Sequence, residues 1–400
     1  MTTPGEPESA SVERTLVEAP WPVARGAAHQ AGTPAAPVSL ALGDATGATL
    51  AVDLPAASAL PPFDTATMDG WAVAGRAPWR LVGEVLAGQR FRALVPGEAV
   101  AIATGAQLPS GAYAVLRRED GTVGADGLRP AGGDVPDGRD VRPAGEEALA
   151  GDVLLPAGTV VTPPVLGLAA AAGHDALQVH PVPTVQVLVL GDELLTAGLP
   201  HDGRVRDALG PQAPGWVAAA GGRLVGLGRV PDTEAATTEA LAQAEADVVV
   251  TTGGTARGPV DQLHRALAQV GGQLLVDQVA VRPGHPMLLC RVPRGPLVVG
   301  LPGNPLAAAV AFASLAVPAL LGCRALALPL LGTAPIGAAV GASASAHRLV
   351  PARYEGGGVV PLPHHGPAML RGLALAELLV VVPPGGVPAG AQVELLPLPW

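Results

Sequence analysis

Continuous apolar runs alternate with helix-like segments between residues 183 and 325, and several of the runs stop at a glycine. Val185–Leu190 stops at Gly191, and Asp247–Thr252 stops at Gly253-Gly254. Runs that are apolar throughout are typical of strands covered on both faces, and helices of about ten residues between them predict a parallel sheet. We therefore predict an α/β domain with a doubly wound, parallel (mixed) sheet. Its ligand cleft is expected at the carboxyl ends of the strands.

The helices between these strands have recognisable ends. Asp232 is a candidate N-cap for a helix that runs to about Glu245. Pro259 suits the first turn of the next helix, and Pro305 begins a long Ala-rich helix. The strands predicted for this domain are Val185–Leu190, Leu224–Val230, Asp247–Thr252, Gln273–Ala280 and Pro296–Leu301.

Two flanking regions contain short strand-like segments separated by Gly-, Asp- and Pro-rich turns. One extends from Trp79 to about Val141, and the other follows Gly322. Both patterns predict small β domains. Aromatic residues make up only 2 % of the chain, so the cores must be built from Ala, Val and Leu.

Charge and cysteine content exclude several classes of protein. The net charge is −10, all 24 basic residues are Arg, and no basic face is evident, so neither nucleic acid nor a membrane surface is an expected partner. Cys290 and Cys323 are too few for a disulfide scaffold or a cysteine zinc site. The run Leu306–Leu321 is shorter than the roughly 20 residues of a membrane span and predicts a buried helix. No secretory signal is recognisable, so we expect a cytoplasmic protein.

Four loops that follow predicted strands have compositions that turn formation alone does not explain. Glycines let backbone N–H groups approach an anion, arginine neutralises charge, and carboxylates suit Mg²⁺. At one edge of a sheet, these loops predict a cleft for a phosphorylated substrate and metal-assisted chemistry at phosphate. The loops are Gly191–Leu194, Thr251–Asp261, Arg282–Pro286 and Leu301–Pro305.

Two further segments with polar residues lie upstream. Asp64 and Asp69 are five residues apart in a loop-rich run, where a Pro-bounded turn with capping aspartates is the simpler interpretation. Thr104 follows a strand in the run Ile102–Pro109. The pair His364-His365 lies in a Pro- and Gly-rich turn and is expected at the surface rather than in a metal site.

Six motifs in this order resemble the molybdopterin molybdenumtransferase family, which includes the MoeA proteins and the gephyrin E domain. Residues 61–73 read PPFDTATMDGWAV, close to a family string of the type PPFDNSAMDGYAV. The resemblance extends from about residue 38 to the C-terminus. The other five matching segments are Thr104–Pro109, Leu190–Leu194, Gly253–Asp261, Arg282–Pro286 and Leu301–Pro305.

The resemblance implies four domains and a homodimer whose cleft is shared between subunits. Residues 1–60 and 141–182 would form a discontinuous N-terminal domain, 61–140 an inserted β domain, 183–325 the α/β molybdopterin-binding domain, and 326–400 a small C-terminal β domain. The implied reaction takes adenylylated molybdopterin and molybdate, hydrolyses the adenylate, releases AMP and leaves molybdenum on the pterin. The substrate would supply the soft sulfur ligands, which explains the lack of a cysteine site.

The resemblance also implies roles for individual residues. The polar cleft residues, expected to be catalytic, are Asp69, Thr104, Glu193, Asp232 and Asp261. Three of these, Glu193, Asp232 and Asp261, would hold Mg²⁺, while Asp69 and Thr104 would face them from the partner subunit. The expected substrate-binding residues are Gly253, Gly254, Thr255, Arg257, Arg282, His285, Pro302, Gly303, Asn304 and Pro305.

Several positions depart from the family pattern. Arg282 and His285 stand where the family has lysines, and the histidine would make anion binding sensitive to pH. Ala256 replaces a serine, with Arg257 beside it. These departures keep a second interpretation open, a catalytically weakened relative that binds molybdopterin or serves as a scaffold. A third, the adenylyltransferase that precedes insertion, shares the α/β domain but lacks the flanking regions.

Overall fold

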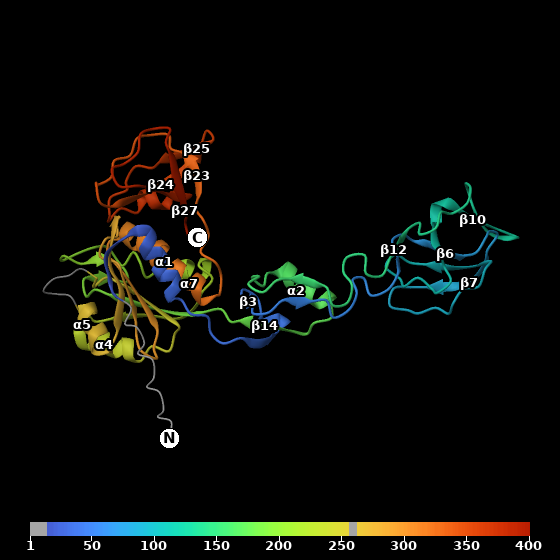
Figure 1. Ribbon diagram of the computed structural model, residues 1–400, viewed down its shortest axis with the longest axis horizontal. Helices are drawn as coiled ribbons and strands as arrows, with labels where there is room; N and C mark the ends of the chain where they lie inside the picture. Colours follow the sequence, from blue (N-terminus) through green and yellow to red (C-terminus); the bar gives the residue numbers. More distant parts are fainter. Residues whose placement is uncertain (1–13, 256–261) are drawn as a thin grey trace, which may run out of the picture. The chain divides into compact units, whose positions relative to one another are not determined.

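The computed structural model describes residues 14–255 and 262–400 of the chain (Figure 1). The chain divides into two compact units. The first unit comprises Met1–Pro37, Gly47–Thr49 and His180–Trp400, and the second comprises Val38–Thr46 and Leu50–Val179. Each unit is described by itself.

The first unit is built on a mixed sheet whose first four strands are parallel, as predicted. The next strand, Leu288–Arg291, was not predicted: it pairs antiparallel with Leu297–Leu301 on one side and, as a hairpin, with Gln273–Arg282 on the other. In spatial order the strands are β18 (Arg223–Val230), β15 (Thr184–Leu190), β19 (Val248–Thr252), β22 (Leu297–Leu301), β21 (Leu288–Arg291) and β20 (Gln273–Arg282).

Helices cover both faces of this sheet, which confirms the doubly wound α/β prediction. In β19, Val248 and Val250 pack on one face against α1 (Trp21–Ala31), α3 (Ala213–Ala219) and the helix after β22. Val249 packs on the other face against α4 (Glu234–Ala242) and α5 (Gln262–Gln269). Successive side chains of a strand point to opposite faces, so a strand that is apolar throughout requires both layers.

The long apolar helix is buried, as predicted. It consists of α6 (Pro305–Ala311), a π-helical turn (Phe312–Ala316) and α7 (Val317–Cys323). Pro318 has no N–H to donate to the carbonyl four residues back, which accounts for the wider turn before it. By length and hydropathy this helix could span a membrane, but 89 % of its most apolar window is buried inside the fold. Trp21 Nε1 donates a hydrogen bond to Ser314 Oγ at 2.8 Å in that core.

The N-terminal segment 14–37 belongs to the first unit rather than to the N-terminal domain in which we expected it. β1 (Leu16–Pro20) pairs in parallel with β20, from Leu16–Val276 to Pro20–Ala280. Helix α1 follows directly and packs against the π-helical turn and α7, with Trp21, Ala24 and Ala28 buried. The apolar residues of this segment complete the core of the α/β domain. The segment was not assigned to that domain because it is too short for its hydrophobic periodicity to be recognised.

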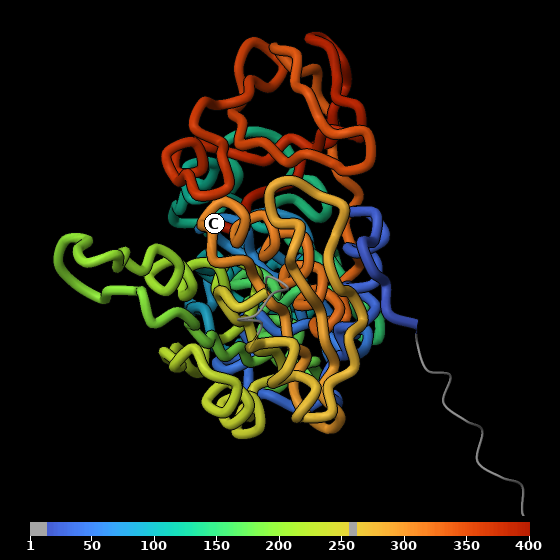
Figure 2. The backbone as a smooth tube through the Cα atoms, turned by 90° about the vertical axis from the view of Figure 1, so that its left-hand side faces the viewer, coloured from blue at the N-terminus to red at the C-terminus, as the bar shows by residue number. Residues whose placement is uncertain are grey.

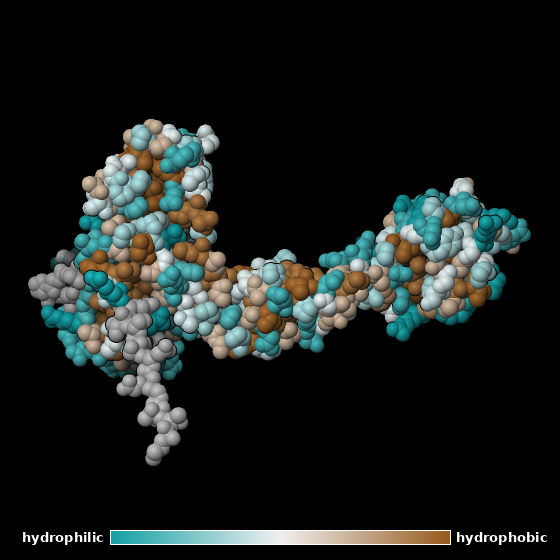
Figure 3. Space-filling view, in the orientation of Figure 1, coloured by the Kyte–Doolittle hydropathy of each residue, from teal (hydrophilic) through white to brown (hydrophobic). Residues whose placement is uncertain are grey.

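The C-terminal β domain continues the same sheet. Val281 and Arg282 of β20 pair in parallel with His347 and Arg348, so strand pairing joins the two domains. Apolar residues reach the surface over this part of the chain (Figure 3). Its elements are β23 (Gly332–Pro335), β24 (His347–Glu355), β25 (Gly358–Pro361), α8 (Arg371–Ala374), β26 (Leu378–Val382) and β27 (Gln392–Pro397).

The second unit contains the predicted inserted β domain as a four-stranded sheet in the order β7-β8-β6-β9. These strands are β6 (Gly70–Ala74), β7 (Arg80–Val85), β8 (Glu98–Ile102) and β9 (Ala114–Arg117). The remaining elements of this unit are short: β2 (Val38–Ala41), β4 (Leu54–Pro55), β5 (Thr65–Ala66), β10 (Gly121–Gly124), β11 (Gly127–Pro130), β12 (Val141–Arg142), β13 (Val153–Leu155) and α2 (Pro163–Ala171). Two short strands, β3 (Thr49–Leu50) and β14 (Ala176–His180), cross the unit boundary.

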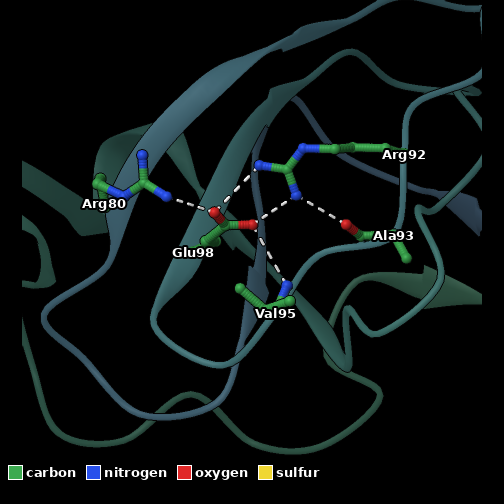
Figure 4. Close-up of polar contacts among 5 residues, drawn as sticks. All are labelled: Arg80, Arg92, Ala93, Val95 and Glu98. Carbon is green, nitrogen blue, oxygen red and sulfur yellow. Dashed lines mark hydrogen bonds and ion pairs between the residues drawn. The ribbon is translucent and has the colours of Figure 1, made fainter.

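A buried carboxylate braces the edge of this sheet (Figure 4). Glu98 is only 4 % exposed, and its oxygens accept hydrogen bonds from Arg80 Nη2 at 2.6 Å and from Arg92 Nη1 and Nη2 at 2.7 and 3.0 Å. The backbone N–H of Val95 adds a bond of 3.3 Å. The hydrogen bonds from Arg92 are the largest cause that lowers the pKa of Glu98. Glu98 therefore remains ionised at its buried position.

Candidate functional site

A cavity of about 600 Å³ lies at the carboxyl ends of β15, β19 and β22, where the sequence placed the cleft. We call it the carboxyl-edge cavity. Three of the four predicted loops line it, and the fourth contributes only Pro286. The predicted site residues that it brings together are Glu193, Asp232, Gly253, Gly254, Thr255, Pro302, Gly303, Asn304 and Pro305. The roles of these residues remain predictions.

The acidic turn after β15 is held by hydrogen bonds to its backbone. Arg229 Nη2 donates to the carbonyls of Gly191 and Leu194 at 3.1 and 2.7 Å. The backbone N–H of Val205 donates to the Glu193 carbonyl at 3.0 Å. Gly191 has φ +129°, and a Cβ at this position would lie 2.8 Å from Glu193 Oε2. A Cβ here would therefore push the exposed Glu193 carboxylate aside, and the positive φ itself favours glycine.

Asp232 carries an ionisable group in an unfavourable environment. Its Oδ1 is buried and has no hydrogen-bond partner among the described residues. Burial raises the pKa of Asp232, and the neighbouring carboxylates of Asp192 and Glu193 raise it further. The predicted N-cap role is wrong, because the side chain of Thr233 caps α4 by accepting from Ala236 N at 3.3 Å. The Asp232 carboxylate is thus not used by the helix.

Glu193 and Asp232 supply the type of ligand that a hard cation such as Mg²⁺ needs, but only these two of the three predicted ligands lie among the described residues. Oxygen donors of this kind are those that Mg²⁺ prefers, and an unpartnered, repelled carboxylate oxygen gains most from a cation. Within residues 14–255 and 262–400, no three His, Cys, Asp or Glu side chains are grouped so as to hold a metal ion. The third predicted ligand, Asp261, lies outside the described residues, as does Arg257.

The glycine turn after β19 does not offer all the donors that we predicted for phosphate. The N–H of Gly253 donates to the Leu301 carbonyl at 2.8 Å and so joins β19 to β22. Gly253 and Gly254 adopt φ +91° and +69°, conformations that favour glycine. Gly303 is a neighbour of this turn, since a Cβ there would be in ordinary contact with Gly253 Cα, at 3.8 Å. The Gly253 N–H is therefore structural, because the strand ladder extends one residue further than the sequence suggests.

A second cavity, of about 750 Å³, lies between β20 and the C-terminal domain, and we call it the basic cavity. Arg282, predicted to line the oxyanion side of the same cleft as the glycine turns, lines this separate cavity, because the pairing of β20 with β24 carries it there. The residues that line it are Arg282, Pro283, Gly341, Ala342, Arg348, His364, His365, Gly366, Pro367 and Met369.

Three basic residues of this cavity, Arg348, His364 and His365, were not predicted as site residues. Arg348 Nη1 donates to the Gly341 carbonyl at 2.8 Å, and His365 Nδ1 lies 2.7 Å from the Leu362 carbonyl. His364 has φ +59°. The adjacent histidines beside Gly366 were a visible signal in the sequence. Arg348 gave none, since only the strand pairing brings it near Arg282.

The two cavities share their walls. In the turn 282–286, Arg282 and Pro283 line the basic cavity and Pro286 lines the carboxyl-edge cavity. In the segment 364–369, Pro367 and Met369 line the first and Ala368 lines the second. The first-turn N–H groups of Leu306 and Ala307 fix that segment by donating to the Pro367 carbonyl at 2.9 and 3.2 Å.

His285 is not a lining residue of either cavity, contrary to our expectation. Its Nε2 lies 3.3 Å from Glu18 Oε1, on the N-terminal strand β1. Glu18 reaches it from a left-handed backbone conformation, with φ +48°. The predicted anion-binding histidine thus pairs with a carboxylate of a segment that the sequence did not place nearby.

Asp69 and Thr104 lie in the second unit, and they contact each other. Asp69 Oδ1 accepts hydrogen bonds from the backbone N–H of Thr104 at 2.7 Å and from its hydroxyl at 2.8 Å. The backbone N–H of Thr104 is the largest cause that lowers the pKa of Asp69, followed by the hydroxyl. Two polar residues 35 positions apart therefore form one local group with an ionised carboxylate.

A parallel α/β domain with an acidic turn and paired glycine turns at its carboxyl edge is of the molybdopterin-binding class. Residues 186–322 match the family model described as a probable molybdopterin binding domain. Residues 14–173 match the MoeA N-terminal region (domain I and II), and residues 333–398 match the MoeA C-terminal region (domain IV).

Comparison with whole proteins leads to the same family. The chain is 34 % identical to molybdopterin molybdenumtransferase 2 of Mycobacterium tuberculosis over 69 % of this chain and 72 % of that protein. It is 32 % identical to the molybdopterin molybdenumtransferase of Haemophilus influenzae over 70 % and 71 %. A crystal structure of a molybdopterin biosynthesis MoeA protein from Pyrococcus horikosii superposes with a TM-score of 0.77 at 25 % identity, covering 97 % of this chain and all of the other. The chain belongs to the molybdopterin molybdenumtransferase family.

Proposed function

We propose that this protein inserts molybdenum into adenylylated molybdopterin, hydrolysing the adenylate and releasing AMP to give the molybdenum cofactor. The observation that carries the proposal is the pair of cavities with shared walls. One offers carboxylates and glycine turns, and the other offers arginines and histidines. The first cavity suits a nucleotide-linked pterin with a bound cation, and the second suits an oxyanion. The two substrates must meet for molybdenum to be transferred, so adjoining cavities support this reaction.

The carboxyl-edge cavity would bind the phosphoanhydride. Glu193 and Asp232 would hold Mg²⁺, with Asp261 as a further ligand. The ion would neutralise charge on the phosphate oxygens during cleavage. Arg229 keeps Glu193 in place through the turn backbone, and the Thr233 cap leaves the Asp232 carboxylate available.

The basic cavity would bind molybdate, an oxyanion. Arg282 and Arg348 supply fixed positive charge, and His364 and His365 supply further hydrogen-bonding groups. Pro283 and Pro286 make the wall between the cavities rigid. An oxyanion held here lies one turn of chain away from the nucleotide-binding side.

The chain itself supplies no thiolate for molybdenum. Cys290 and Cys323 are buried, and burial raises their pKa values to about 12 and about 11. Both remain thiols at neutral pH, so they are poor metal ligands. This supports the proposal that the sulfur ligands of molybdenum come from the pterin substrate.

We propose in addition a cytoplasmic homodimer in which Asp69 and Thr104 of one subunit serve the cleft of the other. Family membership supports this arrangement. The local contact between Asp69 and Thr104 supports a shared role for the two residues.

The decisive experiment supplies adenylylated molybdopterin, molybdate and Mg²⁺ to the purified full-length protein. The proposal expects AMP release and cofactor formation that both require Mg²⁺. Binding of the substrate without AMP release would instead support the weakened relative, for which the occupied Gly253 N–H and Ala256 are the favouring features.

A further inference from the structure

The loop between β16 (Leu194–Leu195) and β17 (Val205–Arg206) borders the carboxyl-edge cavity. The two strands pair in parallel, with Leu195 opposite Arg206. Residues 196–204 are exposed, and the chain around residue 200 extends outward as an open loop (Figure 2). The short strand pair brings Arg206 to the cavity wall, beside Val205 and Asp207.

Arg206 is the one positively charged residue among the described residues that line this cavity. Three carboxylates line it as well. Asp207 Oδ1 accepts hydrogen bonds from the N–H groups of Leu209 and Gly210, both at 2.9 Å, so it stabilises its own turn. Glu193 and Asp232 are the candidate cation ligands. Among the described lining residues, Arg206 is therefore the one that can neutralise charge on a polyanionic substrate.

The guanidinium of Arg206 is partly anchored and partly available. Its Nη1 donates to the Gly198 carbonyl at 3.0 Å, which uses one of five N–H donors. The glycine turn also lines this cavity, but the Gly253 N–H is already used in strand pairing. A phosphate in this cavity therefore needs donors from elsewhere, and an arginine fork matches two phosphate oxygens at once.

We propose that Arg206 binds the diphosphate of the nucleotide-linked substrate in the carboxyl-edge cavity. The inference rests on the proposed function for the identity of the substrate. It goes beyond that function by naming a binding residue outside the six segments that carry the resemblance. The ligand class that it specifies is a nucleoside diphosphate anhydride.

The test measures binding of ADP and of adenosine to the full-length protein by titration calorimetry in the presence of Mg²⁺. Arg206→Gln should weaken ADP binding about tenfold and leave adenosine binding unchanged, because a hydrogen bond to a charged group is lost. Arg206→Lys should fall between the two, since lysine keeps the charge and loses the fork. Arg204→Gln is the matched control: Arg204 is on the same loop and also donates one bond to a backbone carbonyl, that of Asp192 at 3.2 Å.

Equal ADP affinity in wild type and Arg206→Gln would overturn the inference, as would equal weakening by Arg204→Gln. Absence of ADP binding by the wild type would overturn it too. Thermal melting of each variant checks that the fold is intact. Failure of the proposed function would give a different result. The wild type would then release no AMP from adenylylated molybdopterin, while Arg206→Gln would still bind ADP more weakly than the wild type.

Discussion

The backbone N–H of Asp232 donates a hydrogen bond to Asp192 Oδ1 at 3.3 Å, while the carboxylate of Asp232 is repelled by that of Asp192. The contact holds two negative side chains close together at the carboxyl edge of the sheet. Such an arrangement costs stability when both are ionised, and a bound cation relieves it.

Asp232→Asn should therefore stabilise the fold and impair function. Because the pKa of Asp232 is raised, its ionisation destabilises the folded state, and this loss develops as the pH rises through the folded-state pKa. The variant should melt at a higher temperature than the wild type at pH 7, and at the same temperature in acid.

The effect of Mg²⁺ on stability tests whether Asp232 is a ligand of the ion. Mg²⁺ should raise the melting temperature of the wild type more than that of Asp232→Asn. The variant should bind Mg²⁺ at least about tenfold more weakly in calorimetry. Identical Mg²⁺ responses in the two proteins would contradict the role of Asp232 as a ligand.

Gly191→Ala should reduce activity through the position of the Glu193 carboxylate, in addition to the loss of stability that backbone strain causes. The new Cβ would lie 2.8 Å from Glu193 Oε2, so the carboxylate must move. Gly271→Ala is the control, because Gly271, which lines neither cavity, also has a positive φ but a Cβ there has no neighbour within 4 Å. Both variants should lose roughly 1–3 kcal/mol of unfolding free energy, measured by urea titration. Only Gly191→Ala should lose Mg²⁺-dependent AMP release. Equal activity in both would mean that Glu193 does not act there.

Arg348→Gln should weaken molybdate binding. Arg348 lines the basic cavity, whereas Arg353 on the same strand points its guanidinium at Glu355 and serves as the control. We expect about a tenfold loss of molybdate affinity in Arg348→Gln, in direct titration at low salt, and little change in Arg353→Gln. If the two variants bind molybdate alike, the oxyanion site lies elsewhere.

Glu98→Gln should destabilise the second unit. The lowered pKa of Glu98 means that its stabilising effect is present above the ordinary carboxyl pKa and is lost as the pH falls through the folded-state value. The melting temperature of Glu98→Gln should therefore be below that of the wild type at pH 7, and the difference should vanish in acid. Glu84→Gln, an exposed change on neighbouring strand β7, should have little effect at either pH. A difference that persists in acid would mean that Glu98 acts through packing rather than charge.

The amino-acid sequence determined the layers of the α/β domain and the edge at which the acidic and glycine turns meet. Val185–Leu190 and Asp247–Thr252 are apolar on both faces, and only a covered parallel sheet satisfies such strands. Parallel strands end at one edge, so the turns at Gly191, Gly253 and Pro302 had to converge. The hydrophobic pattern of each segment was sufficient to predict the strands and the turns that end them, because both depend on residues that are neighbours in the sequence.

The tertiary structure decided which cavity each side chain serves. Arg282 meets Arg348 because β20 pairs with β24, and His285 meets Glu18 because β1 adds to the far side of β20. Gly253 gives its N–H to Leu301 because the ladder runs one residue past the apolar run. Arg206 reaches the cavity wall through a two-residue strand pair. Each of these contacts depends on pairing between segments distant in the sequence, and hydrophobic periodicity carries no record of such pairing.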